Sequence, residues 1–119
     1  MKSKLLGSMV LAAFILFSIG AALTAAEDEQ VIKITAKKYE YSPNVITVKK
    51  GVPVVLEFTS LDRMHGFSCP GLKIRTDIQP GKVNIVRFVP EQAGRYPFHC
   101  DVFCGLGHTG MKGTIIVTE

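Results

Sequence analysis

The chain has 119 residues, of which 47% are hydrophobic, and a formal net charge of +4 at neutral pH. This length allows one domain with, at most, a targeting segment in addition. Lys2 and Lys4 account for half of the excess charge, and the rest of the chain carries 12 basic against 10 acidic residues. Such a weak balance, with no basic run interleaved with aromatic residues, argues against a nucleic-acid partner.

The first 26 residues resemble a targeting segment. Two lysines are followed by an uncharged run over residues 5–26, which ends in Leu-Thr-Ala-Ala directly before the acidic residues 27–29. The small residues fit cleavage of a secretory signal peptide, but the run is also long enough to span a bilayer. We therefore expect residues 1–26 to be a signal peptide or an N-terminal membrane-anchor helix. Either alternative predicts a periplasmic or otherwise extracytoplasmic protein, with the anchored form held at the inner membrane.

Residues 27–119 are predicted to form one all-β domain. Segments rich in branched and aromatic residues alternate with turn signals at 49–51, 80–81 and 91–94. The predicted strands are residues 31–36, 45–48, 53–59, 72–78, 83–89, 95–100 and 113–117. This spacing is typical of an antiparallel sandwich of seven or eight short strands, with no helix after residue 26.

The clearest functional signal lies between the last two predicted strands, in residues 99–113, which read HCDVFCGLGHTGMKG. Four side chains in this segment carry sulfur or imidazole donors: Cys100, Cys104, His108 and Met111. Sulfur and imidazole ligands together favour a transition metal such as copper or zinc. The four donors reach one centre only if the segment forms a curled loop, and the glycines between them supply the necessary backbone freedom.

A further ligand is expected from outside this loop. His65 follows shortly after the predicted strand 53–59. If that strand lies beside the closing strand 113–117, His65 reaches the same end of the sandwich as the loop. Loops between rigid strands commonly carry the functional residues of such domains.

Together these residues resemble the CuA domain, the dinuclear copper domain of cytochrome c oxidase subunit II and nitrous oxide reductase. That family has a histidine followed by Cys-x3-Cys-x3-His-x2-Met, and His65 with the loop fits this pattern without an insertion. Flanking positions agree as well, including Asp62, residues 80–81, residues 93–96 and Thr114. The resemblance covers residues 27–119 and implies a cupredoxin-like Greek-key β-sandwich.

The resemblance also implies a ligand set for two copper ions. Cys100 and Cys104 would bridge both ions, and His65 and His108 would each bind one. Met111 and the backbone carbonyl of Val102 would be weak ligands, one to each ion. Because the soft bridging sulfurs spread one electron over both ions, little has to rearrange on oxidation, and hydrogen bonds around the ligands set the potential.

The function implied by the resemblance is one-electron transfer in a respiratory chain. A c-type cytochrome or another donor would reduce the centre, and a terminal oxidase or reductase would accept the electron. The sequence contains no recognisable general acid, nucleophile or substrate pocket. We therefore expect the domain not to be an enzyme on its own, but at most a subunit of a terminal oxidase or reductase.

Other chemistries remain open on the residues alone. Cys100 and Cys104 could form a disulfide, as paired cysteines do in many exported proteins. Two cysteines and two histidines also satisfy a closed zinc site. His65, Cys104, His108 and Met111 are sufficient for a mononuclear blue-copper site.

A different function also remains open, that of a periplasmic copper carrier or sensor that serves oxidase assembly. Oxidase subunit II usually has two membrane helices before this domain, whereas this chain has at most one. Cys69 is an additional thiol, and His99 directly precedes the first loop cysteine, both unusual for the family. The sequence leaves open whether either residue contacts the metal.

Overall fold

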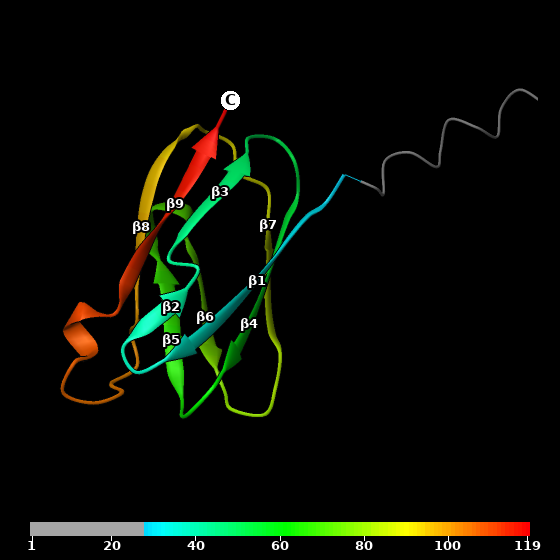
Figure 1. Cartoon of the computed structure of the whole chain (residues 1–119). Helices are drawn as coiled ribbons and strands as arrows, with labels where there is room; N and C mark the ends of the chain where they lie inside the picture. The colour runs from blue at the N-terminus through cyan, green and yellow to red at the C-terminus, as the bar shows by residue number, and fades with distance from the viewer. Residues whose placement is uncertain (1–27) are drawn as a thin grey trace, which may run out of the picture.

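The structure, a computed structural model, describes residues 28–119, which form nine strands in two facing sheets (Figure 1). The predicted signal or anchor segment at residues 1–26 lies outside the described residues. Within residues 28–119, no helix has the length and apolar character needed to cross a bilayer. The prediction of an all-β sandwich is confirmed.

One sheet contains, in spatial order, β2 (Glu40–Ser42), β1 (Gln30–Lys37), β4 (Val54–Ser60) and β7 (Asn84–Phe88). The other contains β3 (Val45–Lys49), β9 (Lys112–Thr118), β8 (Gly94–His99), β5 (His65–Cys69) and β6 (Ile74–Ile78). Two single 3₁₀ turns lie in the connections between strands: Pro70–Leu72 between β5 and β6, and His108–Gly110 between β8 and β9.

The strand pairing differs from the prediction in one respect, because each sheet contains a parallel pair. β1 runs parallel to β4, and β3 runs parallel to β9, whereas the other pairs in both sheets are antiparallel. Parallel neighbours require a crossover connection, and here the chain crosses between the sheets before it returns. A purely antiparallel sandwich was therefore a wrong expectation, although all seven predicted segments contain a strand.

The core lies between the sheets and is formed by the inward side chains of alternating strand residues. Its aromatic part links the two layers. Phe58 on β4 contacts Phe67 on β5 with ring centroids 4.6 Å apart, and Phe67 contacts Phe98 on β8 at 5.1 Å. Tyr41 on β2 then meets Phe98 edge-on at 5.0 Å. Each such side chain contributes about 1.5–3 kcal/mol by leaving water, so this series holds the sheets together.

The sandwich has one end at which β4, β5, β8 and β9 bring loop residues together. The segment between β8 and β9, orange in Figure 1, lies at the end opposite the C-terminus. β4 is not a neighbour of β9, as it lies between β1 and β7 in the other sheet. His65 reaches the loop by a different route, because it begins β5, which pairs directly with β8.

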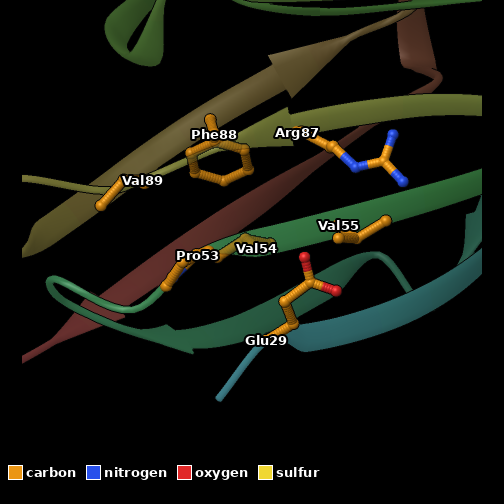
Figure 2. A pocket seen from close by; sticks show the side chains of 7 residues that line it. All are labelled: Glu29, Pro53, Val54, Val55, Arg87, Phe88 and Val89. Carbon is orange, nitrogen blue, oxygen red and sulfur yellow. The ribbon is translucent and has the colours of Figure 1, made fainter. Parts of the chain in front are cut away.

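A shallow pocket lies at the other end, where β1 and β4 begin and β7 ends. Figure 2 shows its lining, which is apolar except for one carboxylate and one guanidinium: Glu29, Pro53, Val54, Val55, Arg87, Phe88 and Val89. No predicted metal ligand lines this pocket. The predicted metal ligands therefore lie at the opposite end of the sandwich.

Candidate metal centre

The loop between β8 and β9 is curled, as its glycines and ligand spacing predict. At its base, the N–H of Cys100 donates to the carbonyl oxygen of Met111 at 3.1 Å. Short-range bonds from His108 N–H to Gly105 O and from Met111 N–H to His108 O tighten the turn. Gly105 has φ +137°, a conformation that disfavours a side chain, and the Tyr39 ring occupies the space that a Cβ would need.

Five predicted ligand side chains meet at this end of the sandwich: His65, Cys100, Cys104, His108 and Met111. Cys104 Sγ is the central atom, 3.7 Å from Cys100 Sγ and 3.7 Å from Nδ1 of His108. It also lies 3.8 Å from Met111 Sδ. One ligating atom each from His65, Cys100 and Cys104 lies within 4.8 Å of the other two.

The sixth predicted ligand atom, the carbonyl oxygen of Val102, is also at the centre. It lies 3.1 Å from Cys100 Sγ, which donates a hydrogen bond to it as a thiol. The carbonyl is positioned by the backbone turn that follows β8, so the identity of the Val102 side chain does not determine its direction. All six predicted atoms are thus in one region.

The three cysteines are free thiols, and the sulfurs of Cys100 and Cys104 are in contact without a covalent bond. Burial, followed by the hydrogen bond and the charge of Cys100, raises the pKa of Cys104 to about 11. A neutral thiol is therefore the form present in the metal-free protein at neutral pH. Because metals bind the thiolate, binding at this site must release protons.

His65 has the environment of a metal-binding imidazole. The residue is fully buried, and its Nε2 lies 2.7 Å from Oδ1 of Asp62. Its Nδ1 is buried and has no hydrogen-bond partner among the described residues. A buried polar atom without a partner is costly, whereas a metal ion would satisfy it. A histidine held by a carboxylate at one nitrogen and available at the other is typical of metal sites.

Asp62 is itself held by three donors. Its carboxylate accepts hydrogen bonds from the N–H of Lys38 at 2.8 Å and from the N–H of Arg63 at 2.6 Å, in addition to the His65 ring. Burial raises the pKa of Asp62, but these hydrogen bonds outweigh it and lower that pKa to about 2. The group is therefore a carboxylate at neutral pH and can only accept hydrogen bonds. The Nε2 of His65 must then carry the proton and donate a hydrogen bond to Asp62.

A second ionic contact fixes the start of the loop. The guanidinium of Arg75 on β6 binds both oxygens of Asp101, with Nε–Oδ2 at 2.7 Å and Nη2–Oδ1 at 2.9 Å. The hydrogen bond from Arg75 is the main cause that keeps the pKa of Asp101 below its usual range. Because Asp101 directly follows Cys100, this pair fixes the backbone next to a predicted bridging sulfur.

His108 lies at the surface of the site, half-buried. Its ring packs on Phe103 with centroids 5.5 Å apart. Phe103 is 71% exposed and Leu106 is 96% exposed, so the solvent-facing side of the loop carries two large apolar side chains. Beneath this exposed surface, the side chains of Cys104 and Met111 are completely buried.

Cys69 and His99 do not belong to the cluster in the described part of the chain. Cys69 is fully buried at the end of β5, where its sulfur lies 3.8 Å from the carbonyl oxygen of Tyr96. His99 is exposed and pairs with Lys112 across β8 and β9. Sequence reasoning missed Tyr41 and Arg75 as residues next to the site, because neither lies near the ligand motif in the chain.

Comparisons with known proteins agree with this fold and site. Residues 8–117 match the family described as cupredoxin-like domain. The chain is 36% identical over 99 residues to cytochrome c oxidase subunit 2 of Thermus thermophilus, covering 83% of this chain and 73% of that one. It is 30% identical over 90 residues to nitrous-oxide reductase of Ralstonia nicotianae, with 72% of this chain but 14% of the reductase covered.

A solved structure shows the same fold. The crystal structure of the periplasmic domain of subunit II of cytochrome oxidase from Bradyrhizobium japonicum superimposes with a TM-score of 0.70 at 22% identity. The match covers 76% of this chain and 84% of that one. The resemblance drawn from the residues is confirmed by these matches.

Proposed function

Since this chain belongs to the family of cupredoxin-like domains and is homologous to subunit 2 of cytochrome c oxidase, we propose that it is a one-electron carrier with a dinuclear copper centre of the CuA type. Copper supplies reversible one-electron chemistry when bound. The protein supplies the ligands, excludes water and keeps the ligand geometry constant, so that little reorganisation accompanies electron transfer.

The proposed ligands are the six groups at the loop end of the sandwich. Cys100 and Cys104 would bridge the two ions after losing their protons. His65 would bind through Nδ1, the buried nitrogen without a partner, and His108 would bind the second ion. Met111 and the carbonyl of Val102 would be the weak ligands.

One observation carries the proposal: three sulfurs and two imidazoles gather around Cys104, with His65 on the buried side and the half-buried His108 on the solvent side. A tetrahedral zinc site needs four donors. A mononuclear blue-copper site uses two histidines, one cysteine and a weak axial ligand. A zinc site of two cysteines and two histidines leaves the Met111 sulfur beside Cys104 without a role. A mononuclear copper site leaves one of the two cysteine sulfurs without a role, whereas a dinuclear centre accounts for all of these groups.

We further propose an extracytoplasmic location and respiratory partners. The apolar N-terminal segment would export or anchor the chain, and homology to an oxidase subunit supports a terminal oxidase or reductase as acceptor. A c-type cytochrome or similar donor would approach the apolar loop surface at Phe103 and Leu106. This surface is where the half-buried His108 brings the centre nearest to solvent.

The test is copper loading of the full chain under reducing conditions, followed by air oxidation. Native mass spectrometry is expected to give two copper ions per chain. Oxidised protein is expected to be purple, with seven hyperfine lines in electron paramagnetic resonance, since one unpaired electron is shared equally by two copper nuclei. One copper per chain with a four-line spectrum would contradict the proposal and favour the mononuclear site.

The same samples test the alternative of a copper carrier. A carrier is expected to remain colourless with Cu(I) and to give its metal rapidly to a competing chelator. An electron carrier is expected to retain copper under the same competition. Rapid transfer by wild-type protein would therefore contradict the role in electron transfer.

A further inference from the structure

Tyr41 has a buried hydroxyl close to the proposed copper centre, and no ligand role accounts for it. The residue lies in the middle of the short strand β2 and is 2% exposed. Its ring packs edge-on against Phe98, a contact that phenylalanine would make equally well. The hydroxyl is therefore the feature that requires an explanation, because a buried polar atom must find a partner.

The partner of the hydroxyl is Gly66. The Oη of Tyr41 donates a hydrogen bond of 2.6 Å to the carbonyl oxygen of Gly66, within the buried interior. Gly66 is the residue between His65 and the aromatic core at Phe67. Its own N–H points to Cys100 Sγ at 3.4 Å. The carbonyl of Gly66 is thus held by Tyr41, and its N–H faces a proposed bridging sulfur.

Space around Gly66 explains why the contact is close. A Cβ at this position would collide with the carboxylate of Asp101 and the side chain of Val102. The absence of a side chain lets the backbone of β5 lie directly against the loop, within hydrogen-bond distance of sulfur. Small displacements of Gly66 therefore change the N–H···S distance directly.

The electrostatic setting keeps Tyr41 in its donor form. Burial foremost, and then the charges of Cys100, Asp101 and Cys104, raise the pKa of the Tyr41 hydroxyl far above its usual range. The hydroxyl is the donor to Gly66 in the metal-free chain, as the geometry of their hydrogen bond shows.

We propose that Tyr41 is a positioning residue that holds Gly66 so that its N–H is aimed at the Cys100 sulfur and raises the reduction potential of the copper centre. A hydrogen bond to a cysteine sulfur withdraws electron density from it, and hydrogen bonding around such sulfurs tunes copper potentials. The more electron-rich, reduced state gains most from this bond. This inference rests on the proposed copper function, but its structural part concerns the metal-free chain.

The experiment compares the full-length wild type with Tyr41→Phe and with Tyr96→Phe as matched control. Tyr96 also donates its hydroxyl to a backbone carbonyl, that of Gln92 at 2.8 Å, but next to the turn that precedes β8. Copper-loaded Tyr41→Phe is expected to have a lower reduction potential than wild type with the same copper content. Tyr96→Phe is expected to have the wild-type potential.

A metal-free measurement separates this inference from the copper proposal. Amide hydrogen exchange of Gly66, followed by NMR, is expected to be faster in Tyr41→Phe than in wild type and unchanged in Tyr96→Phe. If Gly66 exchange is unaltered by Tyr41→Phe, the positioning role is overturned whatever metal the site binds. If exchange accelerates but copper loading gives a single ion, the proposed function fails while the Tyr41–Gly66 link stands.

A second variant covers the case in which Tyr41→Phe does not fold. Fluorotyrosine at position 41 keeps the ring and the hydroxyl but makes the hydroxyl a stronger donor. The reduction potential is then expected to shift upward from the wild-type value. An unchanged or lower potential would overturn the inference.

Discussion

Nε2 of His65 lies 2.7 Å from Oδ1 of Asp62, and this contact determines which imidazole nitrogen is available to a metal. Because the carboxylate engages Nε2, the buried Nδ1 is the free nitrogen. The same carboxylate binds the N–H of Lys38, which follows β1. One side chain thus connects the first sheet to a proposed ligand in the second.

The first prediction concerns Asp62→Asn. The amide keeps the size of the side chain but is a weaker acceptor, so His65 is held less firmly in its metal-binding orientation. We expect copper affinity to fall about 10- to 100-fold, the usual effect of losing such a partner. Competition with a Cu(I) chelator measures this. Asp77→Asn, which alters an exposed carboxylate bound to Arg75, is the control and should keep wild-type affinity.

The second prediction compares two cysteines. Cys100→Ser is expected to abolish the two-copper centre, since a serine hydroxyl cannot replace a bridging thiolate. Cys69→Ser is expected to keep the copper content and spectrum, because Cys69 is buried away from the cluster. Copper counting and absorption spectroscopy check both variants. An unchanged spectrum in Cys100→Ser would show that this sulfur does not bridge the ions.

The loop illustrates how far sequence reasoning reaches. Cys100, Cys104, His108 and Met111 lie in one continuous segment, so their spacing alone predicted a curled loop with donors directed to one centre. The class of fold followed from alternation of apolar and polar residues. Both features depend on residues that are close together in the sequence, so the local sequence pattern is sufficient to predict them.

The remaining features depend on contacts between distant segments. β5 was not predicted as a strand, since HGFSC has no β-branched residue and does not alternate, with four of its five residues buried. It is buried because it lies between β6 and β8, and no local sequence pattern predicts this pairing. The parallel pairs and the approach of Tyr41 to Gly66 arise in the same way. His65 was linked to the loop by resemblance to a family and by an expected pairing of strand 53–59 with strand 113–117, and the structure shows that this pairing was wrong.

The third prediction concerns the weak ligand Met111. Met111→Leu preserves the volume of a fully buried side chain, so we expect the unfolding free energy to fall by less than about 1.5 kcal/mol. Loss of the thioether is expected to shift the reduction potential while the purple colour remains, because weak axial ligands tune the potential of copper–thiolate centres. Voltammetry and absorption spectra measure the two effects. Loss of colour would indicate that Met111 is a principal ligand.

The fourth prediction tests the close approach of β5 to the loop. Gly66→Ala is expected to destabilise the metal-free protein by about 1–3 kcal/mol, because the added methyl group collides with Asp101 and Val102. Gly110→Ala is the control, since nothing lies within 4 Å of a Cβ there. Urea unfolding of both variants gives the free energies. Equal stability of the two would contradict the packing at Gly66.

The last prediction is a pH dependence of stability in the metal-free protein. The pKa of Asp62 is about 2 in the folded chain, below the value of roughly 4 for an unfolded aspartate. The unfolded state therefore takes up a proton first as the pH falls. The stability contributed by Asp62 is complete above about pH 4 and is lost progressively as the pH falls toward about 2.

Asp62→Asn removes this titrating group. We expect the urea midpoint to fall less in the variant than in wild type between about pH 6 and about pH 3, because one of the carboxylates that links folding to protons is gone. Circular dichroism during urea titration measures both midpoints. An identical pH dependence in the two proteins would mean that the hydrogen bonds from Lys38, Arg63 and His65 do not favour the charged form of Asp62.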